Sequence, residues 1–158
     1  MLSKIVSGGQ TGVDRGALDA ALDAGFPCGG WCPKGRKAED GAIPARYPLS
    51  EMASSAYRER TKRNVIDSDG TLILFFGELT GGTRETLLIA EALGKPVLTL
   101  DCSVKPIEDA AVEAAAFIRI HSIGTLNVAG PRESTKQGAA AHARNVVAAI
   151  LALTRART

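Results

Sequence analysis

Three glycine-rich segments of the chain carry hydroxyl, amide and charged side chains beside a permissive backbone. They span residues 8–14, 80–85 and 130–134. Glycine allows the backbone to approach a ligand closely, and the free N–H groups at a helix N-terminus favour an anion. The glycine spacing matches neither a dinucleotide fingerprint nor a Walker sequence. Each segment alone could be a structural turn, but the three together predict a site for an oxyanion or a phosphate group.

The residues expected to bind this ligand come from the three segments and from one further loop. Asp14 and Ser134 have a second interpretation, because side chains of these types also cap helices. Lys34 and Arg36 are expected to steer an anion toward the site more than to grip it. The complete set of expected ligand-binding residues is Gly8, Gly9, Gln10, Thr11, Gly12, Asp14, Lys34, Arg36, Gly81, Gly82, Thr83, Arg132, Glu133 and Ser134.

Other arrangements that would carry chemistry are incomplete. Cys28 and Cys32 are separated by three residues, and no second cysteine pair completes a zinc site. The two histidines lie far apart in the sequence, and no Ser-His-Asp signature or nucleophile elbow is present. The sequence therefore predicts no metal site and assigns no catalytic residue. Three carboxylates remain as candidates for acid–base chemistry without forming a recognisable pair: Asp14, Glu85 and Asp101.

Apolar runs alternate with segments of helical periodicity along the chain, which is typical of an α/β protein. The predicted strands are residues 4–7, 71–76, 97–100 and 125–129, and the predicted helices are residues 13–24, 56–66, 81–93, 106–119 and 134–153. Thr11 with Asp14, and Ser134 with Gln137, have the spacing of capping boxes for the first and last of these helices.

These elements predict a fold class and the place of the ligand site. Strands without polar alternation are typical of a parallel sheet covered on both faces. We therefore expect one Rossmann-like, three-layer ligand-binding domain over residues 1–158, with a mainly parallel sheet and helices on both faces. Ligands of such sheets bind beyond the carboxyl ends of the strands, where all three glycine-rich segments fall.

Residues 26–54 form an irregular segment rich in glycine and proline, which is too long for an ordinary connection. Four apolar residues within it, Trp31, Ile43, Tyr47 and Leu49, predict an ordered loop at the ligand-binding edge. Between residues 34 and 63, basic residues outnumber acidic ones by eight to four. This excess is explained either by a solvated helix face or by a funnel for an anion.

The composition narrows the classes of protein and of partner. The 158 residues carry a formal net charge of only +2, which gives no argument for nucleic acid. No apolar run approaches the roughly 18 residues that span a bilayer, and the chain enters a strand almost at once, so neither a membrane partner nor a signal peptide is expected. Three cysteines without a disulfide framework favour a cytoplasmic compartment. Alanine-rich stretches at residues 110–116 and 139–152 predict a homo-oligomer, a dimer or a tetramer.

Six short motifs together resemble the molybdenum cofactor carrier proteins. They are GGQTGVDR at residues 8–15, GWCPKG at 30–35, EDG at 39–41, IP at 43–44, YPL at 47–49 and NVAGPRES at 127–134. That family belongs to a Rossmann-like superfamily shared with the lysine-decarboxylase-like phosphoribohydrolases. The resemblance covers residues 4–134 and implies a homo-oligomer that binds molybdenum cofactor, which is a phosphorylated pterin, or molybdate at its glycine-rich loops. It further implies that the protein protects this ligand or delivers it to a recipient molybdoenzyme.

One motif separates the chain from the hydrolase branch, whose members resemble Pro-Gly-Gly-x-Gly-Thr-x-x-Glu at the second glycine-rich segment. Alignment on Gly82 and Thr83 places Thr86 where the catalytic glutamate of that branch belongs. Glu85 stands one residue earlier, which rotates it by about 100° on a helix. A non-catalytic carrier is therefore the leading hypothesis. The alternative is a hydrolase acting on a nucleotide or nucleotide-like substrate with Asp14 or Glu85 as the acid–base, and a nucleic-acid-binding module is the weakest hypothesis.

Overall fold

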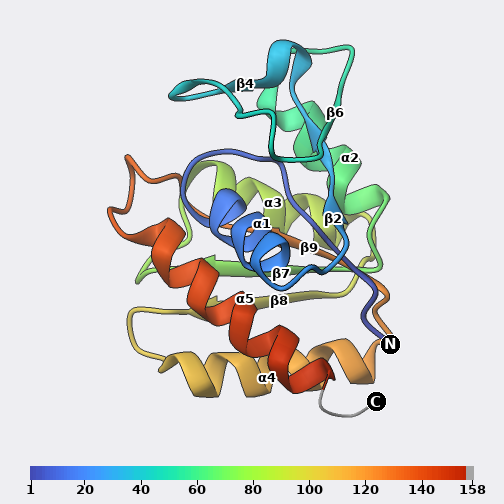
Figure 1. The fold of residues 1–158 in the computed structure, drawn as a ribbon, viewed down its shortest axis with the longest axis vertical. Coiled ribbons are helices and arrows are strands. Elements are labelled where there is room, and N and C mark those ends of the chain that lie inside the picture. Colours follow the sequence, from blue (N-terminus) through green and yellow to red (C-terminus); the bar gives the residue numbers. More distant parts are fainter. Residues whose placement is uncertain (156–158) are drawn as a thin grey trace.

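A five-stranded parallel sheet lies at the centre of the computed structural model, which describes residues 1–155 (Figure 1). Its strands lie in the order β2 (Cys28–Gly29), β1 (Lys4–Val6), β9 (Thr125–Ala129), β7 (Gly70–Phe75) and β8 (Val97–Asp101), and every neighbouring pair is parallel. The four strands predicted from apolar runs and their parallel arrangement are confirmed. β2 is a further edge strand, too short for periodicity to reveal.

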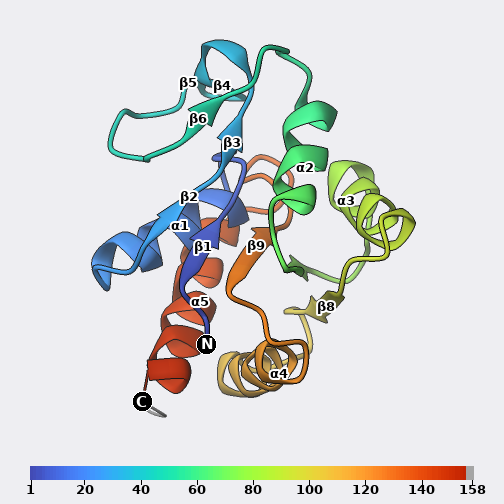
Figure 2. The same ribbon diagram turned by 90° about the vertical axis from the view of Figure 1, so that its right-hand side faces the viewer.

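Helices cover both faces of this sheet (Figure 2). On one face α5 (Ala139–Arg155) packs against both α1 (Val13–Asp23) and α4 (Ile107–Ile120), whereas α2 (Tyr57–Ile66) and α3 (Gly81–Ala92) pack together on the other. Leu72 and Leu74 of β7 are buried in the main core together with residues of α1, α4 and α5. Burial of this kind is expected for a central parallel strand, which helices cover on both faces. The expected Rossmann-like, three-layer α/β fold is confirmed. Within residues 1–155, no helix is both long and apolar enough to cross a membrane.

The small residues of the helices serve packing inside this chain. Ala110, Ala111 and Ala114 of α4 are buried in the main core beside α5. A Cβ atom on Gly16 of α1 would lie 2.2 Å from the carbonyl oxygen of Ala140, so α1 and α5 touch backbone to backbone. Close helix contact within the chain therefore accounts for the alanine-rich pattern, and the pattern by itself is no argument for a homo-oligomer.

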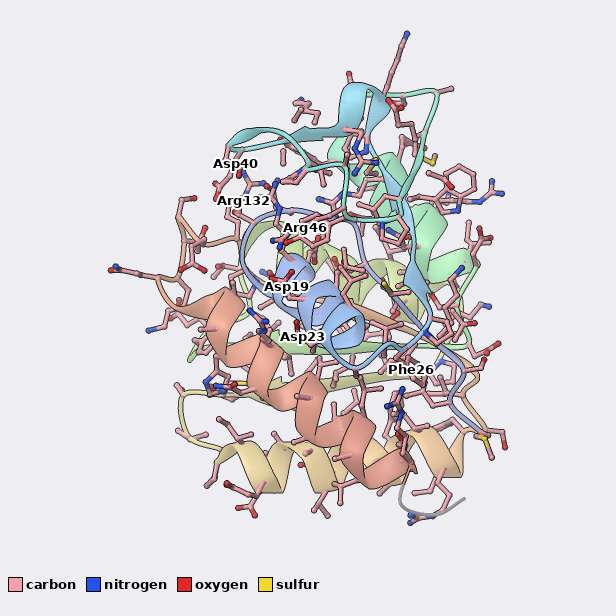
Figure 3. All side chains as sticks on the ribbon, viewed as in Figure 1. Asp19, Asp23, Phe26, Asp40, Arg46 and Arg132 are labelled. Atoms are coloured by element: carbon pink, nitrogen blue, oxygen red, sulfur yellow. The ribbon has the colours of Figure 1, made fainter. Side chains whose placement is uncertain are left out.

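The long segment between β2 and α2 folds as an addition above the sheet edge, at the top of Figure 1. It contains β3 (Trp31–Cys32), the 3-10 turn Lys34–Arg36, β4 (Lys37–Ala38), β5 (Gly41–Ala42) and β6 (Ser50–Glu51). Ile43 and Tyr47, predicted as anchors, are 2% and 1% exposed and form a second small core with Leu18 of α1. The Tyr47 hydroxyl donates to Asp19 of α1 at 2.8 Å, and Arg46 lies beside the same carboxylate (Figure 3).

Both predicted capping boxes are wrong, because tertiary partners take the capping side chains. Thr11 Oγ1 donates to Glu39, and Asp14 Oδ2 accepts the N–H of Gln10 at 3.2 Å. Ser134 Oγ donates to Glu39 at 2.5 Å, and α5 begins later than predicted, at Ala139. The Glu133 carboxylate caps this helix instead, accepting the N–H groups of residues 138 and 140 at 2.6 and 3.0 Å.

Candidate functional site

A cleft of about 530 Å³ opens at the carboxyl ends of β7 and β9. The inner face of α2, the N-terminus of α3 and the loops that follow β1 and β9 form its walls. This is the edge of the sheet at which the sequence predicts a ligand. The volume lies within the range of small-molecule pockets, roughly 300 to 1,000 Å³.

Six of the fourteen residues expected to bind the ligand line this cleft: Gln10, Asp14, Gly81, Gly82, Thr83 and Arg132. The other eight lie outside the cleft. Gly8, Gly9 and Gly12 are buried, and a Cβ atom on Gly12 would lie 2.3 Å from the carbonyl oxygen of Pro131. The first glycine-rich segment is therefore mainly a close packing contact, from which the side chains of Gln10 and Asp14 reach the cleft. The remaining five residues outside the cleft are Thr11, Lys34, Arg36, Glu133 and Ser134.

Arg36 holds the long segment together. Its guanidinium donates to the carbonyl oxygens of Ile43, Pro44 and Tyr47 at 3.0, 2.7 and 2.9 Å and reaches that of Leu49 at 3.4 Å. Lys34 is exposed at the start of the same 3-10 turn. Neither residue borders the cleft, so steering by these two cations stays a prediction about long-range attraction.

The N-terminus of α3 presents backbone donors to the cleft. Its capping residue, Thr80, makes no side-chain cap, and Arg84 is the first residue of the helix whose N–H is bonded, to the Thr80 carbonyl oxygen at 3.2 Å. The N–H groups of Gly81, Gly82 and Thr83 have no acceptor within residues 1–155. Unpaired N–H groups and the positive end of the helix dipole together attract an anion.

The charged side chains of the cleft are partly neutralised in pairs. Arg58 pairs with Glu85 across the α2–α3 boundary, and Arg60 Nη1 lies 3.5 Å from Asp14 Oδ2. Lys136 has its Nζ 5.5 Å from the centre of the Phe76 ring and has no carboxylate partner within residues 1–155. Arg132 Nη1 lies 3.8 Å from Glu39 Oε2 in a long ion pair, so Lys136 is the one cation lining the cleft without a carboxylate partner within residues 1–155; both come from the loop after β9.

Asp14 is the most deeply buried charged group of the cleft, with 4% of its surface exposed. Burial raises the pKa of this carboxyl above its ordinary value, while the nearby Arg60 guanidinium and the bond from the Gln10 N–H act in the opposite direction. The Arg60 guanidinium also lies 5.4 Å from the Tyr57 ring centre, as does that of Arg132. Lys37 Nζ lies 4.6 Å from the same ring centre, so Tyr57 brings three cations together at the α2 wall.

Helix α2 forms a wall of the cleft that the predicted residues omit. Tyr57, Arg60 and Thr61 line the cleft, and Asn64 is buried and exchanges hydrogen bonds with the Trp31 backbone at 2.8 and 3.0 Å. These four residues have the spacing i, i+3, i+4 and i+7 of one helix face. That spacing could have identified the helix face that lines the cleft. The many charged residues of α2 instead favoured its interpretation as a solvated helix.

Comparisons with known proteins show the family of the chain. The model of the circularly permutated YpsA SLOG family (cpYpsA) matches residues 5–151. The chain belongs to this family. A solved structure from Syntrophus aciditrophicus SB, named "Putative molybdenum carrier protein", is similar to it at 45% sequence identity and a TM-score of 0.93, over 95% of each chain. No curated protein matches the chain significantly.

The cpYpsA chain offers no assembled metal site in the part that the structure describes. No group of three or more His, Cys, Asp or Glu residues is placed to hold a metal ion there. All three cysteines are free thiols, and burial raises the pKa of Cys102 to about 11. Cys28 and Cys32 lie in the small core around Tyr47, away from the cleft.

Glu39 joins the first and third glycine-rich segments of the cpYpsA chain. Its carboxylate accepts from the hydroxyls of Thr11 and Ser134, and these bonds hold its pKa below the ordinary value. We expect Glu39→Gln to lower the free energy of unfolding by about 1 kcal/mol at pH 7. A carboxyl with a lowered folded-state pKa stabilises above its unfolded pKa and loses that effect as the pH falls. The deficit should therefore shrink between about pH 5 and pH 3 in urea denaturation.

Glu59→Gln is the matched control for this experiment, since Glu59 is an exposed residue of α2. It should change the unfolding free energy by less than about 0.5 kcal/mol at every pH. A Glu39→Gln deficit that is absent at pH 7, or that grows as the pH falls, would contradict the role assigned to Glu39.

Gly12 allows the loops after β1 and β9 to touch. Its φ is +82°, and an added Cβ would meet the Pro131 carbonyl oxygen. Gly25 has a φ of +61° with no atom within 4 Å of an added Cβ. We expect Gly25→Ala to cost about 1 kcal/mol for the left-handed backbone alone and Gly12→Ala about 2 kcal/mol or more. Equal denaturation midpoints for the two variants would contradict this prediction, because they would show that the loop after β9 accommodates a Cβ atom at Gly12 without loss of stability.

Proposed function

We propose that this protein binds an anionic, phosphorylated pterin, molybdenum cofactor, or molybdate in the cleft and carries it without transforming it. The observation that carries the proposal is the meeting of unpaired α3 N–H groups with two cations in one cleft: Lys136, which has no carboxylate partner within residues 1–155, and Arg132, which is in a long ion pair with Glu39. Hydrogen bonds from N–H groups to a charged acceptor are among the stronger ones in proteins. A phosphate or a molybdate oxyanion suits such a site.

The shape of the cleft supports a ligand with a flat ring as well as an anionic group. Tyr57, Phe75 and Phe76 line it together with the anion-binding elements. Aromatic side chains offer faces and edges against which a heterocycle packs. The similar structure named as a putative molybdenum carrier protein favours a pterin that holds molybdenum as this ligand.

The arrangement of α3 favours carrying over hydrolysis. Thr86, which stands where the hydrolase branch has its glutamate, is buried and donates its hydroxyl to the Gly82 carbonyl oxygen at 2.9 Å. Glu85 is occupied by Arg58. The hydrolase alternative retains one supporting observation, which is that Asp14 combines deep burial, a raised pKa and a place in the cleft.

Native mass spectrometry of the protein purified from molybdate-supplied cells tests the proposal. We expect a bound mass equal to that of a phosphorylated pterin, with or without molybdenum, or of molybdate. The same spectrum reports the number of subunits, for which we propose a homo-oligomer in the cytoplasm that delivers its ligand to a molybdoenzyme. A protein that carries a nucleotide, or that binds none of these ligands when they are added, would contradict the proposed function.

A further inference from the structure

Gln10 is held in a single orientation at the wall of the cleft. Its side-chain oxygen, Oε1, accepts the backbone N–H of Thr11 at 3.1 Å and that of Glu39 at 2.9 Å. Two N–H donors require an oxygen at this position, so the assignment of oxygen and nitrogen in the amide is fixed by its partners. The residue is 6% exposed and lines the cleft.

The other end of the same amide has no partner. Within residues 1–155, three buried side-chain nitrogens make no hydrogen bond: Gln10 Nε2, Arg60 Nε and His142 Nε2. Gln10 and Arg60 both line the cleft. Native proteins pair the great majority of buried donors, so two unpaired donors on residues that line one cleft point to an acceptor supplied from outside the chain.

The neighbouring carboxylate of Asp14 does not accept a hydrogen bond from either of these two nitrogens. Asp14 Oδ2 accepts the backbone N–H of Gln10 at 3.2 Å and lies 3.5 Å from Arg60 Nη1. Gln10 and Arg60 therefore gather around one oxygen atom and still leave Nε2 and Nε unused. An amide NH₂ group donates and does not accept, so an oxo oxygen facing Nε2 is favoured, whereas an amino group in the same position leaves the donor unpaired.

The sheet places this wall and the anion-binding end of α3 on opposite sides of one strand. β1 and β7 flank β9, so their carboxyl ends are separated by two strand spacings, or about 10 Å. A small molecule with a phosphate at Gly81–Thr83 can therefore reach Gln10 with its ring. Arg60 is neutralised by Asp14, whereas Lys136 is available, which places the anionic group at the α3 end.

We infer that Gln10 determines which ring the cleft accepts: Nε2 donates to an oxo oxygen of the heterocycle, so oxo rings of the pterin and hypoxanthine type bind in preference to amino rings of the adenine type. This inference rests on the proposed function, because it takes the cleft to hold a phosphorylated heterocycle. It makes Gln10 a specificity-determining residue and leaves the gripping of the phosphate to α3.

Two substitutions separate the donor from the rest of the side chain. Gln10→Glu keeps an oxygen for the Thr11 and Glu39 N–H groups and replaces the donor NH₂ with an acceptor oxygen. Gln10→Met removes the donor without adding charge. Inosine 5′-monophosphate and adenosine 5′-monophosphate are the probes, because they share the ribose phosphate and differ in an oxo or an amino group on the ring.

Calorimetric titration of both nucleotides into the wild type should give about tenfold tighter binding of inosine monophosphate. Gln10→Met should bring the ratio of the two dissociation constants close to one, and Gln10→Glu should invert it. Molybdopterin binding should weaken in both variants by about the same factor as inosine monophosphate binding. The ratio cancels any general effect of the added charge on the phosphate, and thermal melts confirm that the variants are folded.

The binding data distinguish an incorrect role for Gln10 from an incorrect proposed function. If Gly82→Val weakens every ligand but both Gln10 variants keep the wild-type ratio, the inference about Gln10 is overturned and the carrier proposal stands. A wild type without preference for the oxo ring overturns the inference in the same way. If molybdate and molybdopterin bind equally to the wild type and to Gly82→Val, or to neither, the proposed function itself fails.

Discussion

Replacing Arg60 with methionine is expected to lower the free energy of unfolding by about 3 kcal/mol at pH 7. Arg60 is the ion-pair partner of Asp14, and the two side chains are only 12% and 5% exposed. Removing the cation leaves a buried carboxylate without compensation, which is among the most destabilising single changes in a protein. The Arg60 side chain also covers Gly8, where an added Cβ would lie 2.3 Å from its Nη1 atom.

The pH dependence of this deficit has a definite sign. The folded-state pKa of Asp14 is already raised by burial, and the Arg60 guanidinium opposes that shift. Without Arg60 the pKa rises further. A carboxyl with a raised folded-state pKa stabilises the fold when protonated and loses this effect as the pH rises through that pKa. The difference between wild type and Arg60→Met should therefore become smaller as the pH falls from 7 toward about 5.

Two further proteins complete the experiment. The double variant Arg60→Met with Asp14→Asn should recover most of the lost stability, because no unpaired charge remains buried. Lys62→Met, an exposed change on the same helix, should alter the unfolding free energy by less than about 0.5 kcal/mol. A deficit for Arg60→Met no larger than that of Lys62→Met would show that the pair is solvated in solution.

Replacing Gly82 with valine is expected to weaken the binding of molybdate and of molybdopterin at least tenfold, or by about 1.4 kcal/mol. Gly82 lines the cleft beside the unpaired N–H groups of α3. An added Cβ at this position would have no atom within 4 Å, and its φ lies outside the left-handed range. The fold should therefore accept the side chain, while the branched group shields the N–H donors from the anion.

The matched control for this variant is Arg84→Gln, which removes a charge from the same helix outside the cleft. It should bind both ligands within about twofold of the wild type after correction for ionic strength. Unchanged melting temperatures for both variants would show that any loss of affinity arises at the site. If wild type and Gly82→Val bind molybdate and molybdopterin with equal affinity, the second glycine-rich segment is a structural turn and does not bind the ligand.

The strands and the position of the cleft follow from local sequence. Residues 72–76 are apolar on both faces, which is typical of a covered parallel strand, and the glycine-rich turns follow the carboxyl ends of β1, β7 and β9. The order of the strands in the sheet does not follow from local sequence. β9 is the last strand along the chain, yet it lies between β1 and β7. No local pattern encodes that insertion.

The individual site residues are harder to predict from the sequence, because a polar side chain can bond either to a neighbour in the sequence or to a residue far along the chain. Thr11 and Ser134 have the spacing of helix caps, yet both bind Glu39, and Ser134 is 95 positions away from it. The first glycine-rich segment has the composition of a ligand-binding loop, but Gly12 is needed to fit under Pro131. Distinguishing a glycine that approaches a ligand from one that approaches the backbone requires the fold.

Titration of molybdopterin into the purified protein, followed by recovery and mass analysis of the ligand, tests the carrier proposal most directly. We expect saturable binding that weakens at least about tenfold in Gly82→Val, with the pterin recovered intact. The same incubation with a purine nucleoside monophosphate should leave the nucleotide uncleaved. Release of free base from the nucleotide, abolished by Asp14→Asn, would contradict the account and establish the chain as a hydrolase.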